Sequence, residues 1–247
     1  MINIVVPMAG RGSRFSQAGY TLPKPLLPVF GRPMIEVVIE NLRPNQQHRF
    51  IFICQREHLS AHDLEHILRQ AGPNTLIIPI DHVTEGAACT VLLAESDINN
   101  DDALMIANCD QYIATPIETY LNRMAGGGFD GFIMTMTAND PKWSFIGLDA
   151  DDNVNRVVEK QVVSDEATVG IYNYQRGRDF VAAAHEMIAS NDRTNNEFYV
   201  APAYNYMIRQ GARVGYMNIG ADRAGMYGLG VPEDLENFNA LANMPKK

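Results

Sequence analysis

The sequence has little of what several classes of protein require. Its 247 residues hold three cysteines, and no apolar run reaches the roughly 18 residues that a membrane-spanning helix needs. The cysteines lie far apart in apolar surroundings, so reduced, buried thiols are expected and a disulfide framework is not. No basic region precedes the first apolar stretch, so no secretory signal is predicted and a cytoplasmic location is expected.

Positive charge is also scarce, because 20 Lys and Arg residues stand against 29 Asp and Glu residues, for a net charge of −9. A general nucleic-acid or anionic-membrane binder needs a basic face, so neither partner is expected. One small anionic ligand needs only a few local cations and backbone N–H groups, and this charge balance allows it.

Short β-branched runs alternate with amphipathic helical segments in the first half of the chain. Helices are predicted at residues 33–42, 61–71, 86–95 and 116–124. Strands are predicted at residues 2–6, 50–54, 76–80, 103–107 and 131–137. Most of these strands are nearly continuous apolar runs, which is typical of a parallel sheet covered on both faces. The alternation predicts an α/β, Rossmann-like three-layer fold with right-handed crossovers.

The second half changes character, with short strands predicted at 144–149, 154–159, 168–174 and 213–218 and helices at 178–189, 201–209 and 232–242. No linker, repeat or low-complexity segment interrupts it, so residues 1–247 are expected to form a single domain with a mostly parallel, mixed sheet. Glu233 and Asp234 are expected only to begin the last helix, where acidic side chains suit the helix dipole.

A glycine-bearing, cationic loop follows the first strand. Ligands gather at the carboxyl ends of strands in an open α/β sheet, and this loop leaves one. Gly10 and Gly12 allow a tight turn that brings N–H groups close to phosphate oxygens. Arg11, Arg14 and Lys24 add three cations, and no acidic residue lies between positions 1 and 35. Fixed cations stabilise the charge that builds on a departing pyrophosphate, so the loop predicts a triphosphate site.

Three other readings of the sequence are weaker. A lone G-x-G is a common turn, and the dinucleotide fingerprint is not met because Phe15 stands in place of its third glycine. The P-loop pattern G-x-x-x-x-G-K-[ST] does not occur, which excludes an ordinary kinase or ATPase loop. His62 to His66 fits the inverted zinc-protease pattern H-x-x-E-H on one helix face, but no third ligand follows and a polar, solvent-facing helix side explains it better.

Residues 9–29 resemble the signature of the sugar-nucleotide pyrophosphorylase (nucleotidyltransferase) family, G-x-G-[ST]-R followed by P-K-x-L-x-P-V. The resemblance implies a GT-A-type fold and transfer of a nucleotidyl group from a nucleoside triphosphate to a phosphorylated sugar or alcohol. It also implies that Arg14 holds the departing pyrophosphate and that Lys24 neutralises charge near the transferred phosphate. The nucleotide-binding residues implied in this loop are Ala9, Gly10, Arg11, Gly12 and Ser13.

Two further segments match the family in position. Residues 81–90 follow the third strand, and Thr84, Gly86 and Ala87 are candidates for reading the base, although close packing of a helix on the sheet also favours small residues. Asn108 and Asp110 leave the strand predicted at 103–107. A carboxylate there can hold Mg²⁺ that bridges phosphates, although Asn and Asp also favour strand-ending turns. The resemblance implies that Asn108 binds the nucleotide and that Asp110 binds the metal.

The acceptor side matches the family less closely. Residues 145–147, 157–160 and 169–172 resemble its acceptor-binding stretches, but Gln161 replaces the usual proline. Lys160 is expected to meet the acceptor phosphate, and Glu159 to accept hydrogen bonds from hydroxyl or amine groups; a Glu-Lys pair is otherwise more often surface charge. The acceptor-binding residues implied are Gly147, Glu159, Lys160, Gly170 and Tyr172.

One departure concerns the metal. Residues 228–235 resemble the family stretch D-x-G-T-P-E-D-L, but Gly228 stands where the family has the aspartate that supplies a second metal ligand. Asp222, six residues earlier, or a water molecule is expected to take that position.

The expected activity is therefore that of a Mg²⁺-dependent nucleotidyltransferase, a transferase with a nucleotide-binding half (1–140) and an acceptor-binding half (141–247). A weak preference for CTP follows from the single-domain length, which small cytidylyltransferases acting on non-sugar phosphates share. The acceptor is expected to be a phosphorylated small molecule of surface or capsular polysaccharide synthesis, by way of sugar-nucleotide biosynthesis. Two alternatives stay open: a catalytically silent nucleotide sensor, and a GT-A glycosyltransferase, although Asp110 is followed by Gln111 and Tyr112 and not by a D-x-D pattern.

Overall fold

The computed structural model describes residues 1–241. Its strands are β1 (Ile2–Met8), β2 (Pro28–Val29), β3 (Arg32–Pro33), β4 (His48–Gln55), β5 (Leu76–Ile80), β6 (Ala103–Ala107), β7 (Gln111–Ile113), β8 (Gly131–Thr137), β9 (Ser144–Leu148), β10 (Val154–Glu159), β11 (Glu166–Tyr174), β12 (Val214–Asp222) and β13 (Gly225–Gly228). All but β2 and β3, which form a separate hairpin, join one large sheet.

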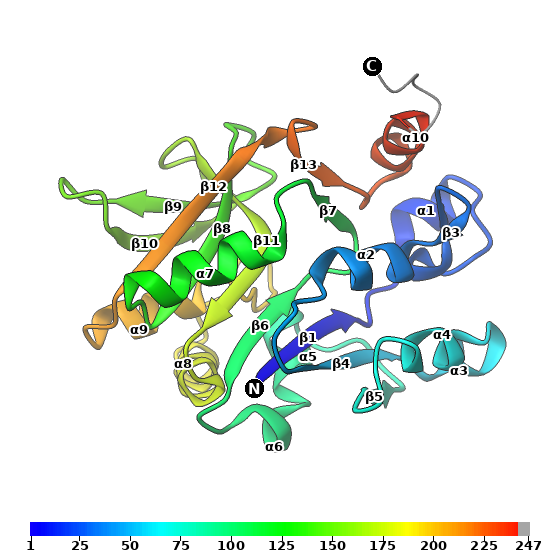
Figure 1. The fold of residues 1–247 in the computed structure, drawn as a ribbon, viewed down its shortest axis with the longest axis horizontal. Coiled ribbons are helices and arrows are strands. Elements are labelled where there is room, and N and C mark those ends of the chain that lie inside the picture. The colour runs from blue at the N-terminus through cyan, green and yellow to red at the C-terminus, as the bar shows by residue number, and fades with distance from the viewer. Residues whose placement is uncertain (242–247) are drawn as a thin grey trace.

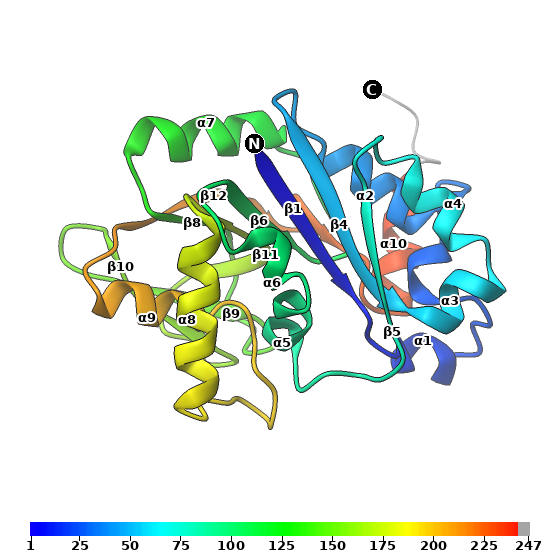
Figure 2. The ribbon, with the colours of Figure 1, turned by 90° about the horizontal axis from the view of Figure 1, so that it is seen from below.

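The helices divide between the two faces of that sheet (Figures 1 and 2). They are α1 (Ser13–Gln17), α2 (Met34–Leu42), α3 (Arg56–Ala61), α4 (Leu64–Arg69), α5 (Ala87–Leu92), α6 (Glu95–Ile98), α7 (Ile117–Gly127), α8 (Gly177–Ala189), α9 (Ala203–Arg209) and α10 (Pro232–Leu241), with a short 3₁₀ turn η1 at Lys24–Leu26.

The sheet is mixed and mostly parallel, as the sequence predicts. Its strand order is β5-β4-β1-β6-β11-β8-β12-β13-β7, with β9 and β10 attached beside β11. Strands β5, β4, β1 and β6 are parallel. Strand β11 runs antiparallel to both β6 and β8, so β8 again points the same way as β6. The carboxyl ends of β1 and β6 therefore meet at the same edge, which is the edge where such sheets bind ligands.

Alternation along the strands builds two cores. Ile4 and Val6 of β1 pack with Phe52 of β4 against the face covered by α2, α4, α7 and α10. Val5 and Ile51 point to the opposite face, under α5, α6, α8 and α9. Successive side chains of a strand point to opposite faces, so a sheet covered on both sides needs apolar residues at every position. The three-layer α/β fold follows from that pattern.

The helix predicted at 61–71 starts too early. Its residues 64–69 form α4, but α3, which was not predicted, ends at Ala61, and Asp63 takes a left-handed backbone conformation (φ 51°) before α4 begins at Leu64. His62 lies outside both helices. His62 and His66 therefore do not share a helix face, which excludes the zinc-protease pattern.

Other boundaries differ in smaller ways. The helix predicted at 86–95 ends at Leu92, and α6 follows as a separate turn. The strand predicted at 213–218 continues to Asp222 because it pairs with β13. The short strands β7 and β13 are absent from the prediction, since three or four residues carry no readable periodicity. Residue 242, the predicted end of the last helix, lies outside the described residues.

The expectations about membrane-spanning helices and about the three cysteines can be compared with the structure. Within residues 1–241 no helix has the length and apolar character that crossing a membrane requires. The three thiols are free; Cys54 and Cys109 are buried, and Cys89 is half-buried. Burial raises the pKa of the Cys109 thiol to about 11, so this thiol stays protonated at neutral pH.

Substitutions at two glycines test how tightly the helices pack in this structure. A Cβ at Gly177, the first residue of α8, would lie 2.0 Å from the carbonyl oxygen of Ile98. We expect Gly177→Ala to lower the free energy of unfolding by about 1–3 kcal/mol through overpacking. Gly126 in α7 has open space around it, so Gly126→Ala is expected to raise stability by about 0.5–1 kcal/mol. Urea unfolding of both variants measures these changes, and equal effects would contradict the packing described.

Candidate active site

The loop after β1 turns sharply at Gly12. Its φ of 60° is left-handed, and its carbonyl oxygen accepts hydrogen bonds from the N–H groups of Phe15 (3.0 Å) and Ser16 (3.3 Å), which start α1. A Cβ at Gly12 would lie 3.4 Å from Cβ of Lys24. Glycine thus serves both the turn and the close approach of the η1 segment.

Lys24 forms an ion pair with Asp110, which lies just beyond the carboxyl end of β6. The Lys24 ammonium donates to Oδ2 of Asp110, and the two side chains are 20% and 23% exposed. Burial alone would lower the pKa of Lys24, but the Asp110 carboxylate and the nearby Cys109 outweigh it, and the pKa of Lys24 is raised above its ordinary value. Lys24 therefore stays charged at neutral pH and brings the cationic loop against Asp110.

Two cavities meet at this ion pair. The smaller, of about 240 Å³, is lined by Gly10, Gly12 and Lys24 from the loop region and by Asn108 and Asp110. The larger, of about 500 Å³, is open to solvent, and the predicted site residues that line it are Arg14, Ala87, Asn108, Asp110, Glu159, Gly170 and Tyr172. Asn108 and Asp110 line both cavities, so the structure joins the predicted nucleotide loop and most of the predicted acceptor residues in one region.

Gly170 fixes how the chain leaves β6. Its carbonyl oxygen accepts hydrogen bonds from the Asn108 backbone (3.0 Å) and from Nε2 of Gln111 (3.1 Å). Its φ is 80°, and a Cβ there would lie 2.2 Å from Nδ2 of Asn108. Only glycine allows β11 to pass this close to residues 108–111, so Gly170 sets the position of the Asp110 segment.

At the far end of the larger cavity lie polar and aromatic groups. Ser144 donates a hydrogen bond to Glu159, and burial raises the pKa of Glu159 above its ordinary value. Lys160, with a left-handed backbone (φ 55°), donates from Nζ to the hydroxyl of Tyr199 at 2.8 Å. The pKa of Lys160 is raised, chiefly by this hydrogen bond. The cavity therefore combines a buried carboxyl group with a nearby ammonium group.

Several lining residues were missed by the sequence reading. Lys142 lies 4.9 Å from the ring centroid of Trp143, the only tryptophan of the chain, and both line the larger cavity. Both residues lie just before the motif at 145–147, and this position in the sequence could have identified them as candidates. Tyr199 also lines the larger cavity and carries no local signal of its own. Asp234 lies in the motif at 228–235 and in the first turn of α10 as predicted, but it lines the cavity as well, so its expected role at the helix start alone is incomplete.

Some predicted residues lie away from the two cavities. Arg11 faces a separate hollow of about 340 Å³ with Gln55 and Asp81. Ser13 begins α1 and is exposed, and Ala9 is buried, its carbonyl oxygen accepting a hydrogen bond from Gln55 at 2.7 Å.

The base-reading candidates are only partly at the cavity. Ala87 lines it, but the Thr84 hydroxyl turns inward and donates to the carbonyl oxygen of Gly86 at 2.9 Å. A Cβ at Gly86 would lie 2.4 Å from the carbonyl oxygen of Phe198. Close packing is therefore sufficient to explain the glycine at position 86.

Two residues of the predicted acceptor and metal sets are also elsewhere. Gly147 is covered by Arg156, whose Cγ would lie 2.6 Å from a Cβ at that position. Asp222 ends β12, where it pairs with Met226 of β13, and it does not line either cavity.

The region around Asp110 fits a hard divalent cation. Within residues 1–241 no cluster of three or more His, Cys, Asp or Glu side chains could hold a metal by itself. Mg²⁺ needs only one or two carboxylates when phosphates and water supply its other ligands. The Lys24 ammonium on Oδ2 shows that this carboxylate already accommodates a cation. Asp110 is thus suited to a cation that is shared with a phosphorylated ligand.

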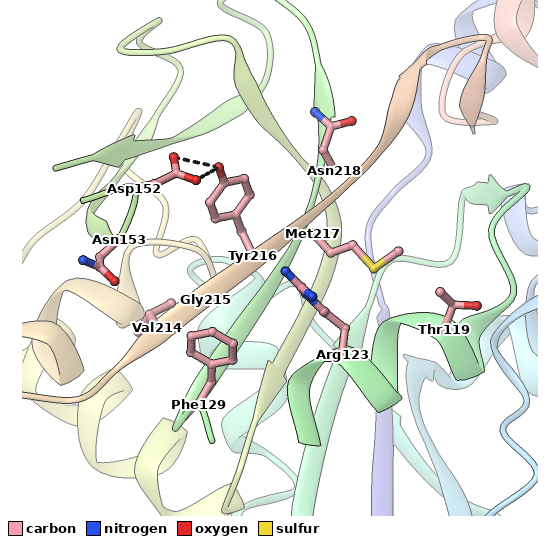
Figure 3. A pocket seen from close by; sticks show the side chains of 10 residues that line it. All are labelled: Thr119, Arg123, Phe129, Asp152, Asn153, Val214, Gly215, Tyr216, Met217 and Asn218. Carbon is pink, nitrogen blue, oxygen red and sulfur yellow. Dashed lines mark hydrogen bonds between the residues drawn. The ribbon is translucent and has the colours of Figure 1, made fainter. Parts of the chain in front are cut away.

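A further cavity, of about 650 Å³, lies elsewhere (Figure 3). Arg123 of α7 faces it together with Tyr216 of β12, whose hydroxyl donates to Asp152 at 3.0 Å. It sits at the amino ends of β8 and β12, whereas ligands of open α/β sheets gather at the carboxyl ends. No motif residue lines it, so size alone does not identify the active site here.

Known proteins resemble this chain in sequence over most of its length. The sequence model of the nucleotidyl transferase family matches residues 4–221. The bifunctional protein GlmU of Cupriavidus metallidurans is 24% identical over 219 residues, which cover 86% of this chain and 46% of GlmU. The chain thus spans about half the length of the curated relatives it matches.

Solved structures share the fold over nearly the whole chain. The nucleoside-diphosphate-sugar pyrophosphorylase from Vibrio cholerae RC9 superposes with a TM-score of 0.80 at 26% identity, covering 96% of this chain and 99% of that one. The inositol-1-phosphate CTP transferase from T. maritima reaches a TM-score of 0.74 at 13% identity, covering 97% and 94%. At that low identity the second likeness concerns the fold alone.

Glu159 predicts a pH dependence. Its pKa in the folded chain is raised by burial above the ordinary value of 4.5, so its ionised form opposes folding. We expect Glu159→Gln to raise the free energy of unfolding near pH 8, and this gain to vanish as the pH falls below about 4.5, where the wild-type carboxyl is protonated in both states.

Urea unfolding across that pH range measures the effect, with Glu57→Gln, at an exposed carboxylate, as the control. A gain of equal size at both ends of the range would show that burial of charge is not its cause.

Proposed function

The chain belongs to the nucleotidyl transferase family, and from this premise we propose that it joins the nucleotidyl group of a nucleoside triphosphate to a phosphorylated small molecule with release of pyrophosphate. The observation that carries the proposal is the Lys24–Asp110 ion pair. It holds the cationic loop beside a carboxylate at the point where the two cavities meet. In this proposal residues 1–140 serve the nucleotide and residues 141–247 the acceptor, within one domain.

The reaction is an in-line displacement at phosphorus. An oxygen of the acceptor phosphate attacks the α-phosphorus, a new P–O–P bridge forms, and the bond to the β-phosphate oxygen breaks with its electrons leaving on pyrophosphate. No side chain needs to act as nucleophile or accept a proton from the attacking phosphate. The catalytic contribution of the protein is therefore positioning and electrostatic stabilisation.

Each charged group has a place in that reaction. The N–H groups between Gly10 and Ser13 bind the triphosphate, and Arg14, which lines the larger cavity, stabilises charge on the departing pyrophosphate. Lys24 stays protonated and neutralises charge on the transferred phosphate. Asp110 would hold Mg²⁺, which when bound neutralises phosphate charge as a Lewis acid.

The acceptor is a phosphorylated metabolite with hydroxyl or amine groups. Lys142 lines the larger cavity, and Lys160, which does not line it, donates to the hydroxyl of the lining residue Tyr199; both ammonium groups are near enough to meet a phosphate of the acceptor. Glu159 and Ser144 lie on its wall and can accept or donate hydrogen bonds to polar groups of the acceptor. The product is an activated nucleoside diphosphate derivative of the kind consumed in surface or capsular polysaccharide synthesis.

We further propose CTP as the nucleotide. The small residue Ala87 on the cavity wall supports a planar base lying against backbone. One protein of the same fold is named an inositol-1-phosphate CTP transferase. The proposed enzyme is thus a cytidylyltransferase that acts in the cytoplasm on a sugar phosphate or a non-sugar phosphate.

Two substitutions test the catalytic roles. We expect Arg14→Ala and Asp110→Asn each to lower turnover by roughly 10²–10³-fold or more, since each removes one preorganised charge interaction. Pyrophosphate release from CTP with a panel of phosphorylated acceptors measures it, and circular dichroism checks the fold. Arg123→Ala, in the separate cavity, is the matched control and is expected to keep full activity. Normal turnover in either test variant would refute these roles.

The nucleotide preference has its own test. We expect CTP, among CTP, UTP, dTTP, GTP and ATP with Mg²⁺, to raise the melting temperature most, because preferential binding stabilises the fold by about 2.7 kcal/mol at 100 times Kd. A larger shift with another base would replace CTP in the proposal. Stabilisation by nucleotide without pyrophosphate release would favour the silent sensor, and stabilisation only by nucleotide sugars would favour a glycosyltransferase.

A further inference from the structure

The segment after β13 packs directly on Asp110. The Leu229 N–H donates to the Asp110 carbonyl oxygen at 2.7 Å, and Gly228 pairs with Gln111 across β13 and β7. A Cβ at Gly230 would lie 2.7 Å from Oδ2 of Asp110. A side chain at position 230 would therefore meet the Asp110 carboxylate, and both glycines line the larger cavity together with Asp110.

Asp234, in the first turn of α10, leans into that space. Its Oδ2 lies 3.5 Å from where a Cβ of Gly228 would stand. Apart from the neighbours of Gly228 in the chain, Asp234 is the residue of the described structure that comes within 4 Å of that position. Asp234 and Asp110 line the same cavity together with Arg14.

The two oxygens of Asp234 have different surroundings. Oδ1 accepts a hydrogen bond from Nη2 of Arg223 at 3.0 Å. Within residues 1–241, no hydrogen bond or ion pair reaches Oδ2, the oxygen nearest Gly228. Arg223 therefore fixes the side chain through one oxygen and leaves the other directed to the space beside Asp110.

Both of these aspartates already have a cation on one oxygen, Lys24 on Asp110 and Arg223 on Asp234. Carboxylate oxygens are the ligands that Mg²⁺ prefers. Asp222, the other acidic candidate, pairs within the β12–β13 ladder and does not line the cavity. The arrangement provides two carboxylates from different elements around one opening.

We propose that Asp234 supplies the second carboxylate of the divalent-cation site of Asp110, taking the place of the side chain that is missing at Gly228. This inference rests on the proposed function, because the cation is the one shared with the triphosphate. In this proposal a carboxylate from the first turn of α10 serves in place of one from β13, and its Oδ2 lies 3.5 Å from where a Cβ at position 228 would stand.

The test measures Mn²⁺ alone, by the electron paramagnetic resonance signal of the free ion in titrations of the full chain. We expect one site in the wild type, and Asp234→Asn and Asp110→Asn each to weaken Mn²⁺ binding at least 10-fold, since even partners that only orient metal ligands contribute 10- to 100-fold. Glu233→Gln removes the neighbouring charge on the same helix turn (81% exposed) and is expected to bind Mn²⁺ as the wild type does.

A second variant, in which the carboxylate is moved to position 228, separates loss of the cation ligand from loss of folding. Gly228→Asp in the Asp234→Asn background is expected to restore Mn²⁺ affinity to within about threefold, a difference of under 1 kcal/mol, because nothing nearer than 3.5 Å would meet the new Cβ. Asp234→Asn should melt near the wild-type temperature, since its pair with Arg223 (53% exposed) is open to solvent.

Unchanged Mn²⁺ binding in Asp234→Asn, a loss in Asp222→Asn instead, or no Mn²⁺ site in the wild type would each overturn the assignment. The proposed function fails separately. If the wild type binds Mn²⁺ through Asp234 and yet releases no pyrophosphate with any nucleotide, the cation site stands and the transferase activity does not.

Discussion

The contact between Lys24 and Asp110 is the interaction on which the arrangement of the site depends. It joins a loop that leaves β1 to a carboxylate that leaves β6, and these two strands are neighbours in the parallel part of the sheet. Without a counter-charge, a partly buried lysine would favour its neutral form. The carboxylate keeps it charged, so the same pair that closes the loop also maintains the cation that a phosphate requires.

Glycines determine how close other segments come to that pair. Gly12 allows Lys24 to approach the loop, Gly170 allows β11 to cross residues 108–111, and Gly230 allows the segment after β13 to pass close to the Asp110 carboxylate. Each stands where a side chain would meet a neighbouring atom or force a left-handed backbone into strain. The site is therefore built as much by missing side chains as by charged ones, which lets three separate strands and a loop converge on one carboxylate.

The same principle explains how an altered motif can still support a cation site. Losing a carboxylate at position 228 opens space, and the first turn of α10 presents Asp234 to that space with Arg223 holding it. Function in such sites follows from where an oxygen lies and not from which residue number carries it. A site defined by sequence order alone would have assigned Asp222, whose β12–β13 pairing keeps it away from the cavity.

The sequence by itself determined the α/β fold class, nearly all strands of the large sheet and the cationic loop with Lys24 and Asp110, because strand periodicity and short motifs are local properties. The roles of these site residues remain predictions. Only the tertiary structure decided that α3 and α4 are separate helices on either side of Asp63, that Gly86 packs on Phe198, and that Asp234 lines the cavity. These facts depend on contacts between segments far apart in the chain, and no local pattern encodes which distant atoms will meet.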